Sequence, residues 1–342
     1  MGNKRADLIV IALSLVFVIG IVLCVAFLYL PNYQSKEASA EVVETELSEQ
    51  EALSLLTDEA YEAALQEGRD EVLASIKENI LESNSTMNAL RAAYTDDIVV
   101  YSDGVLRFIP VEESVPKTEV LRENIEVLET GEFQYIEDGT VVSQKGIDVS
   151  KYQGDIDWEQ VAADGVTYAF LRVGIRGYGS GAIVLDETFH QNVEGAQAAG
   201  IEVGIYFYSQ AITVDEAIEE VDFILSEIAG YAITYPIVMD VEMVGESGAR
   251  ADALTIDERT EIAIAFCEQV ITAGYVPMIY GNTETFTTML DITAIVEYER
   301  WIAFYDDELY FPYEFAVWQY THAGSVAGID GETDLNISFK TW

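Results

Sequence analysis

Two residue types that often build reactive sites are scarce in this chain of 342 residues, which has two cysteines and two histidines. Cys24 lies in an apolar run and Cys267 in a segment with helical periodicity, so we expect no disulfide between them. Neither cysteine has the spacing of a metal ligand. His190 and His322 lie far apart in the sequence. These absences argue against a histidine-based metal site and against a Ser-His catalytic triad.

Basic residues are also scarce, with 17 Lys and Arg against 61 Asp and Glu, which gives a formal net charge of −44. Proteins that bind phosphate backbones need clustered Lys and Arg. The charge therefore argues against a nucleic acid or an anionic lipid surface as a partner. Hydrophobic residues make up 50% of the chain, which excludes a disordered protein. The acidic excess is typical of a well-solvated extracellular protein.

Residues 8–30 form a nearly unbroken apolar run. At about 1.5 Å per residue, such a helix would reach roughly 34 Å, enough to span the hydrocarbon core of a bilayer. Lys4 and Arg5 precede it, so the positive-inside rule places residues 1–7 in the cytoplasm and the remaining chain outside the cell membrane. The alternative is a cleaved signal peptide, because Ala38-Ser39-Ala40 has the small residues of a cleavage site. The length of the apolar run favours an uncleaved transmembrane anchor.

Residues 31–93 have the composition of an acidic helical stalk. Residues 41–83 are rich in Glu, Ala and Leu and contain no proline. Apolar residues recur at helical spacing from Leu65 to Ile80, which predicts either one long helix or two helices separated by an interruption at Gly68. We interpret the stalk as a spacer. Self-association as a coiled coil is the alternative, although no heptad is sustained.

Residues 94–143 predict a small β-rich segment. Residues 98–101 and 105–109 flank Asp103-Gly104, the signature of a β-hairpin turn. Residues 133–136 and 141–142 indicate a second hairpin. A small separate module and a collar on the following domain are both compatible with this pattern, and no chemistry can be assigned to it.

Residues 144–342 alternate between strand and helix patterns. Capping boxes at Thr213 with Glu216 and at Thr255 with Glu258, and C-cap glycines at Gly200 and Gly274, bound the helices. Eight strands with fewer full helices predict an α/β fold, a small irregular TIM-like β/α barrel. The expected strands are 146–149, 167–173, 202–208, 236–242, 276–280, 300–304, 315–320 and 333–337; the expected helices are 187–199, 214–229 and 256–273, with short helical pieces after Asp157 and Asn282.

The fourth expected strand, residues 236–242, ends in two acids. Side chains alternate faces along a strand, so Asp240 and Glu242 should point the same way, with Cβ atoms roughly 6–7 Å apart. Two acids on an otherwise apolar strand are costly unless something uses or satisfies them. They are either caps of neighbouring loops or a glycosidase acid/base pair.

Further polar and aromatic residues are expected at the same end of the barrel, where β/α barrels carry their function. Asp148 ends the first strand, and Asp334 lies beside the last strand, which neighbours the first if the barrel closes. Tyr206, Tyr208, Trp301 and Trp318 lie on the strands between. Each acid alone would be an ordinary cap and each aromatic an ordinary core residue. Together they are typical of a carbohydrate site, where rings stack on sugars and carboxylates bind hydroxyls.

Several motifs resemble glycoside hydrolase family 25, the N-acetylmuramidase lysozymes. Residues 146–154 read Gly-Ile-Asp-Val-Ser-Lys-Tyr-Gln-Gly, followed by Asp157-Trp158, and resemble the opening motif of that family. Asp240-Val241-Glu242 resembles its Asp-x-Glu pair. The other matching segments are 170–174, 186–206, 301–303, 317–320 and 328–336. The resemblance covers about residues 144–342 and leaves residues 1–143 outside it.

The resemblance implies hydrolysis of the β-1,4 bond between N-acetylmuramic acid and N-acetylglucosamine in peptidoglycan glycan strands, with no metal or other cofactor. Glu242 would be the general acid. Asp240 would orient the 2-acetamido group of the substrate in a retaining mechanism. The competing mechanism is inversion, in which Asp148 or Asp334 activates water.

The expected substrate-binding residues are Arg172, Tyr206, Tyr208, Trp301, Trp318 and Gln319. Arg172 would either bind substrate or form an ion pair within the barrel. One departure concerns Phe207, near which many relatives carry a histidine, and this difference would alter substrate preference.

Three functions therefore remain open at this point. The first is a membrane-anchored muramidase that remodels the wall of its own cell. The second is a non-catalytic glycan-binding scaffold on the same barrel, which the retention of all four acids disfavours. The third is a chitinase-like hydrolase, which the opening motif disfavours.

Overall fold

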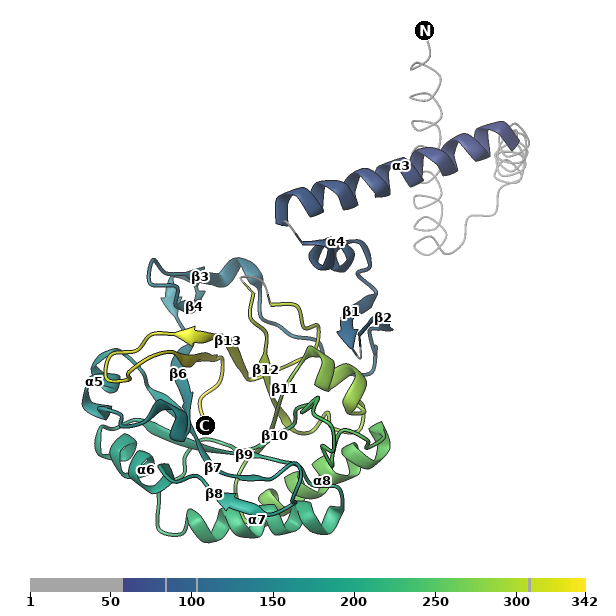
Figure 1. Ribbon diagram of the computed structural model, residues 1–342. Coiled ribbons are helices and arrows are strands. Elements are labelled where there is room, and N and C mark those ends of the chain that lie inside the picture. Colours follow the sequence, from purple (N-terminus) through teal and green to yellow (C-terminus); the bar gives the residue numbers. More distant parts are fainter. Residues whose placement is uncertain (1–57, 84, 103, 307–308) are drawn as a thin grey trace, which may run out of the picture. The chain divides into compact units, whose positions relative to one another are not determined.

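The computed structural model in Figure 1 describes residues 58–342 except 84, 103, 307 and 308. The expected cytoplasmic tail (1–7), transmembrane anchor (8–30) and first part of the stalk (31–57) lie outside the described residues. Within the described part of the chain, no helix is long and apolar enough to cross a membrane. The chain divides into two compact units at Glu78 and Asn79, and the second unit contains everything discussed below except the stalk helix.

The described part of the stalk is helical, as predicted. Helix α3 (Asp58–Ser83) runs without a break through Gly68, so of the two alternatives the single helix is observed in this range and the interruption is not. One glycine costs a helix only about 1 kcal/mol, which a helix of this length tolerates. Helix α4 (Thr86–Ala93) begins at Ser85, whose side chain accepts a hydrogen bond from the Asn88 N–H. Self-association of the stalk stays a prediction.

The second unit contains the predicted barrel (Figure 1). Strands β6, β7 and β9 to β13 run parallel, and β14 is antiparallel to both of its neighbours, β13 and β6, so that the sheet closes. A further strand, β8 (Ile183–Leu185), was not expected and pairs antiparallel with β7. The eight barrel strands are β6 (Gln144–Val149), β7 (Tyr168–Arg176), β9 (Glu202–Tyr208), β10 (Ile237–Asp240), β11 (Pro277–Asn282), β12 (Glu299–Ala303), β13 (Val317–Gly324) and β14 (Thr333–Ser338).

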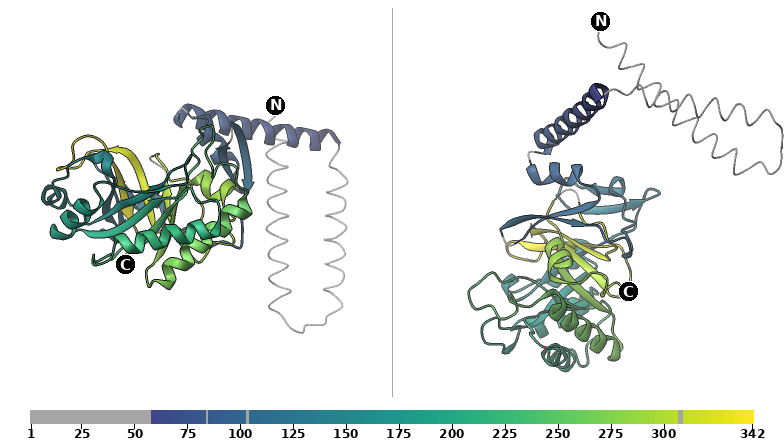
Figure 2. Two further views of the ribbon diagram at one scale, coloured as in Figure 1. Left: turned by 60° about the horizontal axis from the view of Figure 1, so that its bottom comes forward. Right: turned by 90° about the vertical axis from the view of Figure 1, so that its right-hand side faces the viewer.

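Helices cover only part of the barrel, as the sequence predicted. Helices α7 and α8 lie side by side on the outside, where Gln269 donates a hydrogen bond to Asp222 at 3.0 Å (Figures 1 and 2). The remaining connections carry short helices or loops. The helices are α5 (Trp158–Ala163), α6 (Phe189–Ala198), α7 (Val214–Glu227), α8 (Ile256–Thr272) and the single π-helical turn η3 (Thr285–Met289).

The helix caps agree with the sequence in all but one case. Thr255 and Glu258 form the complete capping box. At α7, Thr213 accepts from the Glu216 N–H, but the Glu216 carboxylate binds the Ile212 N–H and Arg250 instead of completing the box. The ion pair with Arg250 competes for this carboxylate, so the box predicted there is only half formed.

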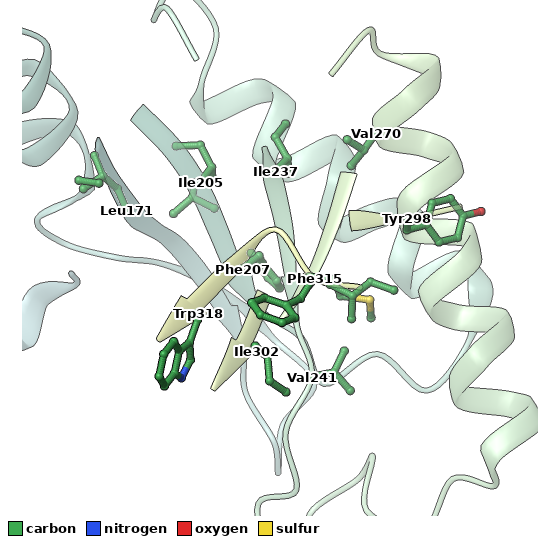
Figure 3. Packing of buried hydrophobic residues seen from close by; sticks show 14 of the residues in the cluster. Leu171, Ile205, Phe207, Ile237, Val241, Val270, Tyr298, Ile302, Phe315 and Trp318 are labelled. Atoms are coloured by element: carbon green, nitrogen blue, oxygen red, sulfur yellow. The ribbon is translucent and has the colours of Figure 1, made fainter. Parts of the chain in front are cut away.

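Alternation along the strands separates two hydrophobic cores. One lies inside the barrel and includes Phe170, Met278 and Trp301. The other lies between the strands and the outer helices; Figure 3 shows part of it, including Leu171, Ile205 and Trp318. Residues that are adjacent in the sequence, such as Phe170 and Leu171, therefore face opposite cores.

The interior core leaves no room for a side chain at Gly146 of β6. A Cβ built there would lie 2.1 Å from Cζ of Tyr168. We expect Gly146→Ala to lower the free energy of unfolding by about 3 kcal/mol, because the Tyr168 ring has to move within a packed core. Urea unfolding would measure this. Gly179→Ala is the control, since no atom lies within 4 Å of its added Cβ; equal stability of both variants would contradict the packing argument.

Residues 94–143 form both predicted hairpins and pack against the barrel, so the collar is the arrangement observed. Phe133 stacks on Tyr320 of β13 with ring centres 4.4 Å apart. The Tyr310 and Tyr313 hydroxyls accept from the Val99 and Glu112 N–H groups, each at 2.8 Å. The elements of this collar are β1 (Asp97–Ser102), β2 (Val105–Pro110), η1 (Arg122–Asn124), β3 (Ile125–Val127), which was not expected, β4 (Phe133–Glu137) and β5 (Thr140–Val141).

Candidate active site

Three of the four predicted acids lie at the same end of the barrel strands. Asp148 lies near the carboxyl end of β6, and Asp240 is the last residue of β10. Asp334 lies near the start of β14, but this strand is antiparallel, so its start meets the carboxyl ends of the others. Asp334 is the direct register partner of Asp148. Closure of the barrel thus brings residues from opposite ends of the domain together.

Glu242 reaches the same mouth by a different route than predicted. The expected strand 236–242 stops at Asp240, so Glu242 lies in the following loop and does not share a strand face with Asp240. The Val241 N–H still bonds to Tyr280 O, but the Val241 carbonyl accepts from the Thr285 hydroxyl at 3.2 Å. This side-chain bond replaces the next ladder bond, and the chain leaves the sheet with Glu242 exposed.

Asp148 is held by a network of buried amides and hydroxyls. Its Oδ1 accepts from the side chains of Gln319 at 2.8 Å and Asn336 at 2.7 Å. The Gln319 Oε1 in turn accepts from the hydroxyls of Tyr280 at 2.8 Å and Tyr305 at 2.6 Å. Burial raises the pKa of Asp148 to about 6, although the two amide hydrogen bonds oppose this rise.

Asp240 is buried at 6% exposure, and its Oδ1 has no hydrogen-bond partner among the described residues. Burial raises its pKa well above the ordinary value, and the charges of Glu242 and Asp148 add to this effect, while Arg172 opposes it. A buried, unpartnered carboxyl is unfavourable for folding. Its presence here is typical of a functional group that gains its partner from a ligand.

Glu242 and Asp334 complete the cluster. Glu242 is accessible at the rim, yet the surrounding protein still desolvates its carboxyl and raises its pKa, with a further contribution from the charge of Asp148. Burial and the charge of Asp148 raise the pKa of Asp334 to about 8. Each of the four acids therefore lies close enough to influence at least one other, which is the convergence that the sequence predicted.

Arg172 points into the barrel from β7, but its ion pair is not with any of these four acids. Its Nη2 lies 2.7 Å from Oδ2 of Asp186, and its guanidinium lies 5.1 Å from the centre of the Tyr152 ring. Burial alone would raise the pKa of Asp186, but hydrogen bonds from Thr188, Lys151 and Arg172 outweigh it and lower the pKa. Arg172 is thus a fixed positive charge beside Asp240.

The predicted aromatic residues divide between the mouth and the core. Tyr206 and Tyr208 are half-buried, and burial together with nearby acids raises the pKa of both. Trp301 lies beneath them in the interior core, stacked on Phe170 at 4.5 Å, with its indole N–H donating to Asn336 at 2.8 Å. Tyr206 and Tyr208 can face a ligand, whereas Trp301 supports the floor of the site.

Besides Trp301, two further predicted substrate-binding residues do not line the mouth. Trp318 faces the outer core, where its ring lies 5.1 Å from that of Phe133 in the collar and its N–H donates to Phe304 O (Figure 3). The prediction for Trp318 is therefore wrong, because the pleat of β13 turns it away from the barrel interior. Gln319 points inward but is 2% exposed, so it positions Asp148 and does not line a surface open to substrate.

Some residues of the site were not predicted. Asn336 follows Asp334 by two positions and so shares its face, and Tyr280 is the register partner of Asp240. The alternation of side chains would have identified both. Tyr305 and Tyr152 lie outside the strands, at 50% and 77% exposure, and no periodic signal points to them.

The raised pKa of Asp334 predicts a pH-dependent stability difference. Between about pH 4 and 8 the folded state keeps a proton on Asp334 that the unfolded chain has lost, so the stability falls as the pH rises through this range. Asp334→Asn removes this effect. Its free energy of unfolding, relative to the wild type, should therefore increase from pH 4 to 8 and level off above pH 8 in urea titrations.

The matched control is Asp157→Asn, because a hydrogen bond from the Gln160 side chain lowers the pKa of Asp157. The stabilisation from that carboxylate is present above about pH 4 and is lost as the pH falls, which is the opposite sign. A difference between wild type and Asp334→Asn that stays constant from pH 4 to 8 would contradict the assignment.

Comparison with known proteins agrees with this geometry. The sequence model of "Glycosyl hydrolases family 25" matches residues 147–329, more than half of the chain. The chain is 27% identical over 194 residues to the autolytic lysozyme of Clostridium acetobutylicum, covering 56% of this chain and 55% of that protein. It is 27% identical over 203 residues to lysozyme M1 of Streptomyces globisporus, covering 56% and 66%.

The fold also has solved counterparts. The structure of the modular autolysin LytC from Streptococcus pneumoniae has a TM-score of 0.53 at 24% identity, covering 70% of this chain and 51% of that one. The chain spans little more than half the length of this protein and of the Clostridium lysozyme. With the barrel, the four converging acids and the matching sequence model in place, the chain belongs to family 25 of the glycosyl hydrolases.

Proposed function

We propose that the protein is a peptidoglycan hydrolase of the lysozyme type, which cleaves the β-1,4 bond between N-acetylmuramic acid and N-acetylglucosamine. The observation that carries this proposal is the acid cluster at one barrel mouth, in which Glu242 is accessible and the Asp240 Oδ1 has no hydrogen-bond partner among the described residues. Membership of family 25 and the similarity to two proteins named lysozyme support it.

Glu242 has the properties of the general acid. Such an acid must hold a proton near neutral pH and must reach the leaving oxygen. The raised pKa of Glu242 supports the first requirement, and its position at the rim supports the second. In this proposal Glu242 protonates the glycosidic oxygen as the bond to the anomeric carbon breaks.

Asp240 is placed to act on the substrate's acetamido group. Its free Oδ1 can accept the acetamido N–H, which orients the acetamido oxygen for attack on the anomeric carbon. The inverting alternative needs a general base. Asp334 with a pKa of about 8 carries a proton at neutral pH, and the Asp148 Oδ1 is occupied by two amide donors. These features favour substrate-assisted retention, one of the exceptions to the two-carboxylate scheme.

The apolar run at residues 8–30 leads us to propose that the protein is held in the cell membrane by this segment, with residues 1–7 inside and the barrel outside. Anchoring would confine cleavage to the wall close to the cell, which suits remodelling. Carbonate washing of membranes from an expressing cell tests this. Release of the full-length protein into the wash would contradict the anchor.

The proposed activity is tested with purified peptidoglycan sacculi and the full chain in detergent. We expect soluble glycan fragments to appear with the wild type and not with Glu242→Gln. A glycan-binding scaffold would instead co-sediment with the sacculi and release nothing. Binding without release in the wild type would therefore overturn the hydrolase in favour of the scaffold.

A further inference from the structure

A second concave surface lies next to the active-site mouth. It is a groove of about 840 Å³ between the collar and the hairpin that joins β13 to β14. Residues 130–133 form one wall, residues 320–327 form the other, and Tyr305 lies at the edge. We call it the collar groove. Its first wall lies before residue 147, outside the part of the chain that the family model matches.

The collar groove is continuous with the catalytic network through Tyr305. This side chain is 50% exposed and lines the groove, and its hydroxyl donates to Oε1 of Gln319 at 2.6 Å. The amide of Gln319 holds Asp148 at 2.8 Å. A molecule bound in the groove therefore contacts Tyr305, which is linked to Asp148 by two successive hydrogen bonds through Gln319. This closeness is what we expect if the groove and the active site bind neighbouring parts of one substrate.

The strand beside the groove offers an edge for an extended peptide. β13 pairs with β12 only from Val317 to Gln319, and beyond Gln319 the described residues give it no partner on that side. Its pairing with β14 also shifts register on both sides of Thr321. The exposed residues His322 and Ala323 lie in this stretch. The Ala323 N–H donates to the Thr321 hydroxyl at 3.1 Å, so this donor is not available to a ligand. Unpaired backbone groups along a strand edge bind extended peptides, whereas a sugar chain has no matching repeat of N–H and C=O groups.

The charge of the groove selects among peptides. Glu132 and Asp164 line it, and both carboxylates bind the single ammonium of Lys145, at 2.7 and 2.9 Å. Two acids share one base, so this cluster keeps a negative charge. The described lining residues include no Lys or Arg. Such a surface attracts a peptide that carries an amino group.

We propose that the collar groove binds the peptide branch of the substrate, as an extended segment with an amino-bearing side chain, beside the sugar bond that is cleaved. This inference rests on the proposed function, because peptidoglycan is a glycan that carries short peptides on alternate sugars. The catalytic barrel recognises the sugars, and the collar adds recognition of the peptide.

The first test measures peptide binding without hydrolysis. The full chain carrying Glu242→Gln is titrated in a calorimeter with the synthetic tetrapeptide N-acetyl-L-Ala-γ-D-Glu-L-Lys-D-Ala, whose blocked N-terminus leaves the lysine ammonium as its one amino group. Adding Ala323→Trp should fill the groove from an exposed position and weaken binding at least tenfold. Ala229→Trp, an exposed position after α7 at the other end of the barrel, should leave the Kd unchanged. A peptide acetylated on the lysine should bind at least threefold more weakly.

The second test uses wild-type catalysis on two substrates, intact peptidoglycan and glycan strands stripped of peptides by an amidase. The wild type should show at least a tenfold higher kcat/KM on the intact polymer. Ala323→Trp should remove this preference and leave the rate on stripped strands unchanged.

The outcomes separate the two proposals. Equal rates on both substrates, or no effect of Ala323→Trp, would overturn the collar groove inference while leaving the hydrolase intact. Hydrolysis of neither substrate would overturn the proposed function, and the peptide titration would then still decide whether the groove binds peptide.

Discussion

Replacement of Glu242 by glutamine is expected to reduce peptidoglycan hydrolysis on the order of 10³-fold, the usual contribution of a general acid. Glutamine keeps the shape of the side chain but has no proton to give to the leaving oxygen. Glu242 is exposed in the loop after β10, so the substitution should not lower the melting temperature. Turnover of peptidoglycan by the purified full chain, measured as release of reducing ends, tests this expectation.

Two controls separate a lost acid from a disturbed site. Glu246→Gln changes an exposed acid of the same loop and should keep full activity. An aryl glycoside with a good leaving group needs little protonation, so Glu242→Gln should lose far less activity on that substrate than on peptidoglycan. Glu242→Gln activity on peptidoglycan within about threefold of wild type would contradict the assignment of Glu242 as the acid.

Replacement of Asp240 by asparagine is expected to reduce activity by roughly 10²-fold to 10³-fold and, at the same time, to stabilise the protein. Activity falls because an amide cannot balance the positive charge that develops as the acetamido group attacks. Stability rises because the Asp240 carboxyl is buried, its Oδ1 has no hydrogen-bond partner among the described residues, and its ionised form is repelled by the charges of Glu242 and Asp148. Loss of activity with gain of stability distinguishes a functional carboxylate from a structural one.

The stabilisation should depend on pH with a definite sign. The raised pKa of Asp240 means that its ionisation costs stability as the pH rises above about 4. Asp240→Asn should therefore gain more over the wild type at pH 8 than at pH 5 in urea unfolding. Asp252→Asn is the contrasting variant, because the Asp252 carboxylate accepts from the Val244 and Gly245 N–H groups and its loss should destabilise the loop. Destabilisation by Asp240→Asn would contradict the account.

The positions of Asp148, Asp240 and Asp334 could be predicted because each depends on local pattern and one rule of topology. The apolar runs predicted where the strands lie. The three acids lie near strand ends that meet at one end of a closed barrel. The position of Glu242, in a loop and not on the strand, could not be predicted in this way. The strand stops at Asp240 because the Thr285 hydroxyl, more than forty residues further along the chain, takes the Val241 carbonyl.

The error at Trp318 has a general cause. In a barrel strand both faces are buried, so alternation shows that Trp318 and Gln319 face opposite sides but not which side is the interior. The collar decides this, since Phe133 covers the outward face of β13. The placement of the collar depends in turn on contacts such as Val99 with Tyr310, which are about two hundred residues apart. No local pattern in the sequence encodes such pairs.

The measurement that tests the central claim most directly is the identity of the new ends made by the protein. Purified peptidoglycan is digested with the wild type and with Glu242→Gln, and the released fragments are reduced and analysed by mass spectrometry. The account predicts reducing N-acetylmuramic acid ends from the wild type and none from the variant. Reducing N-acetylglucosamine ends, or the same ends from both proteins, would contradict a muramidase that depends on Glu242.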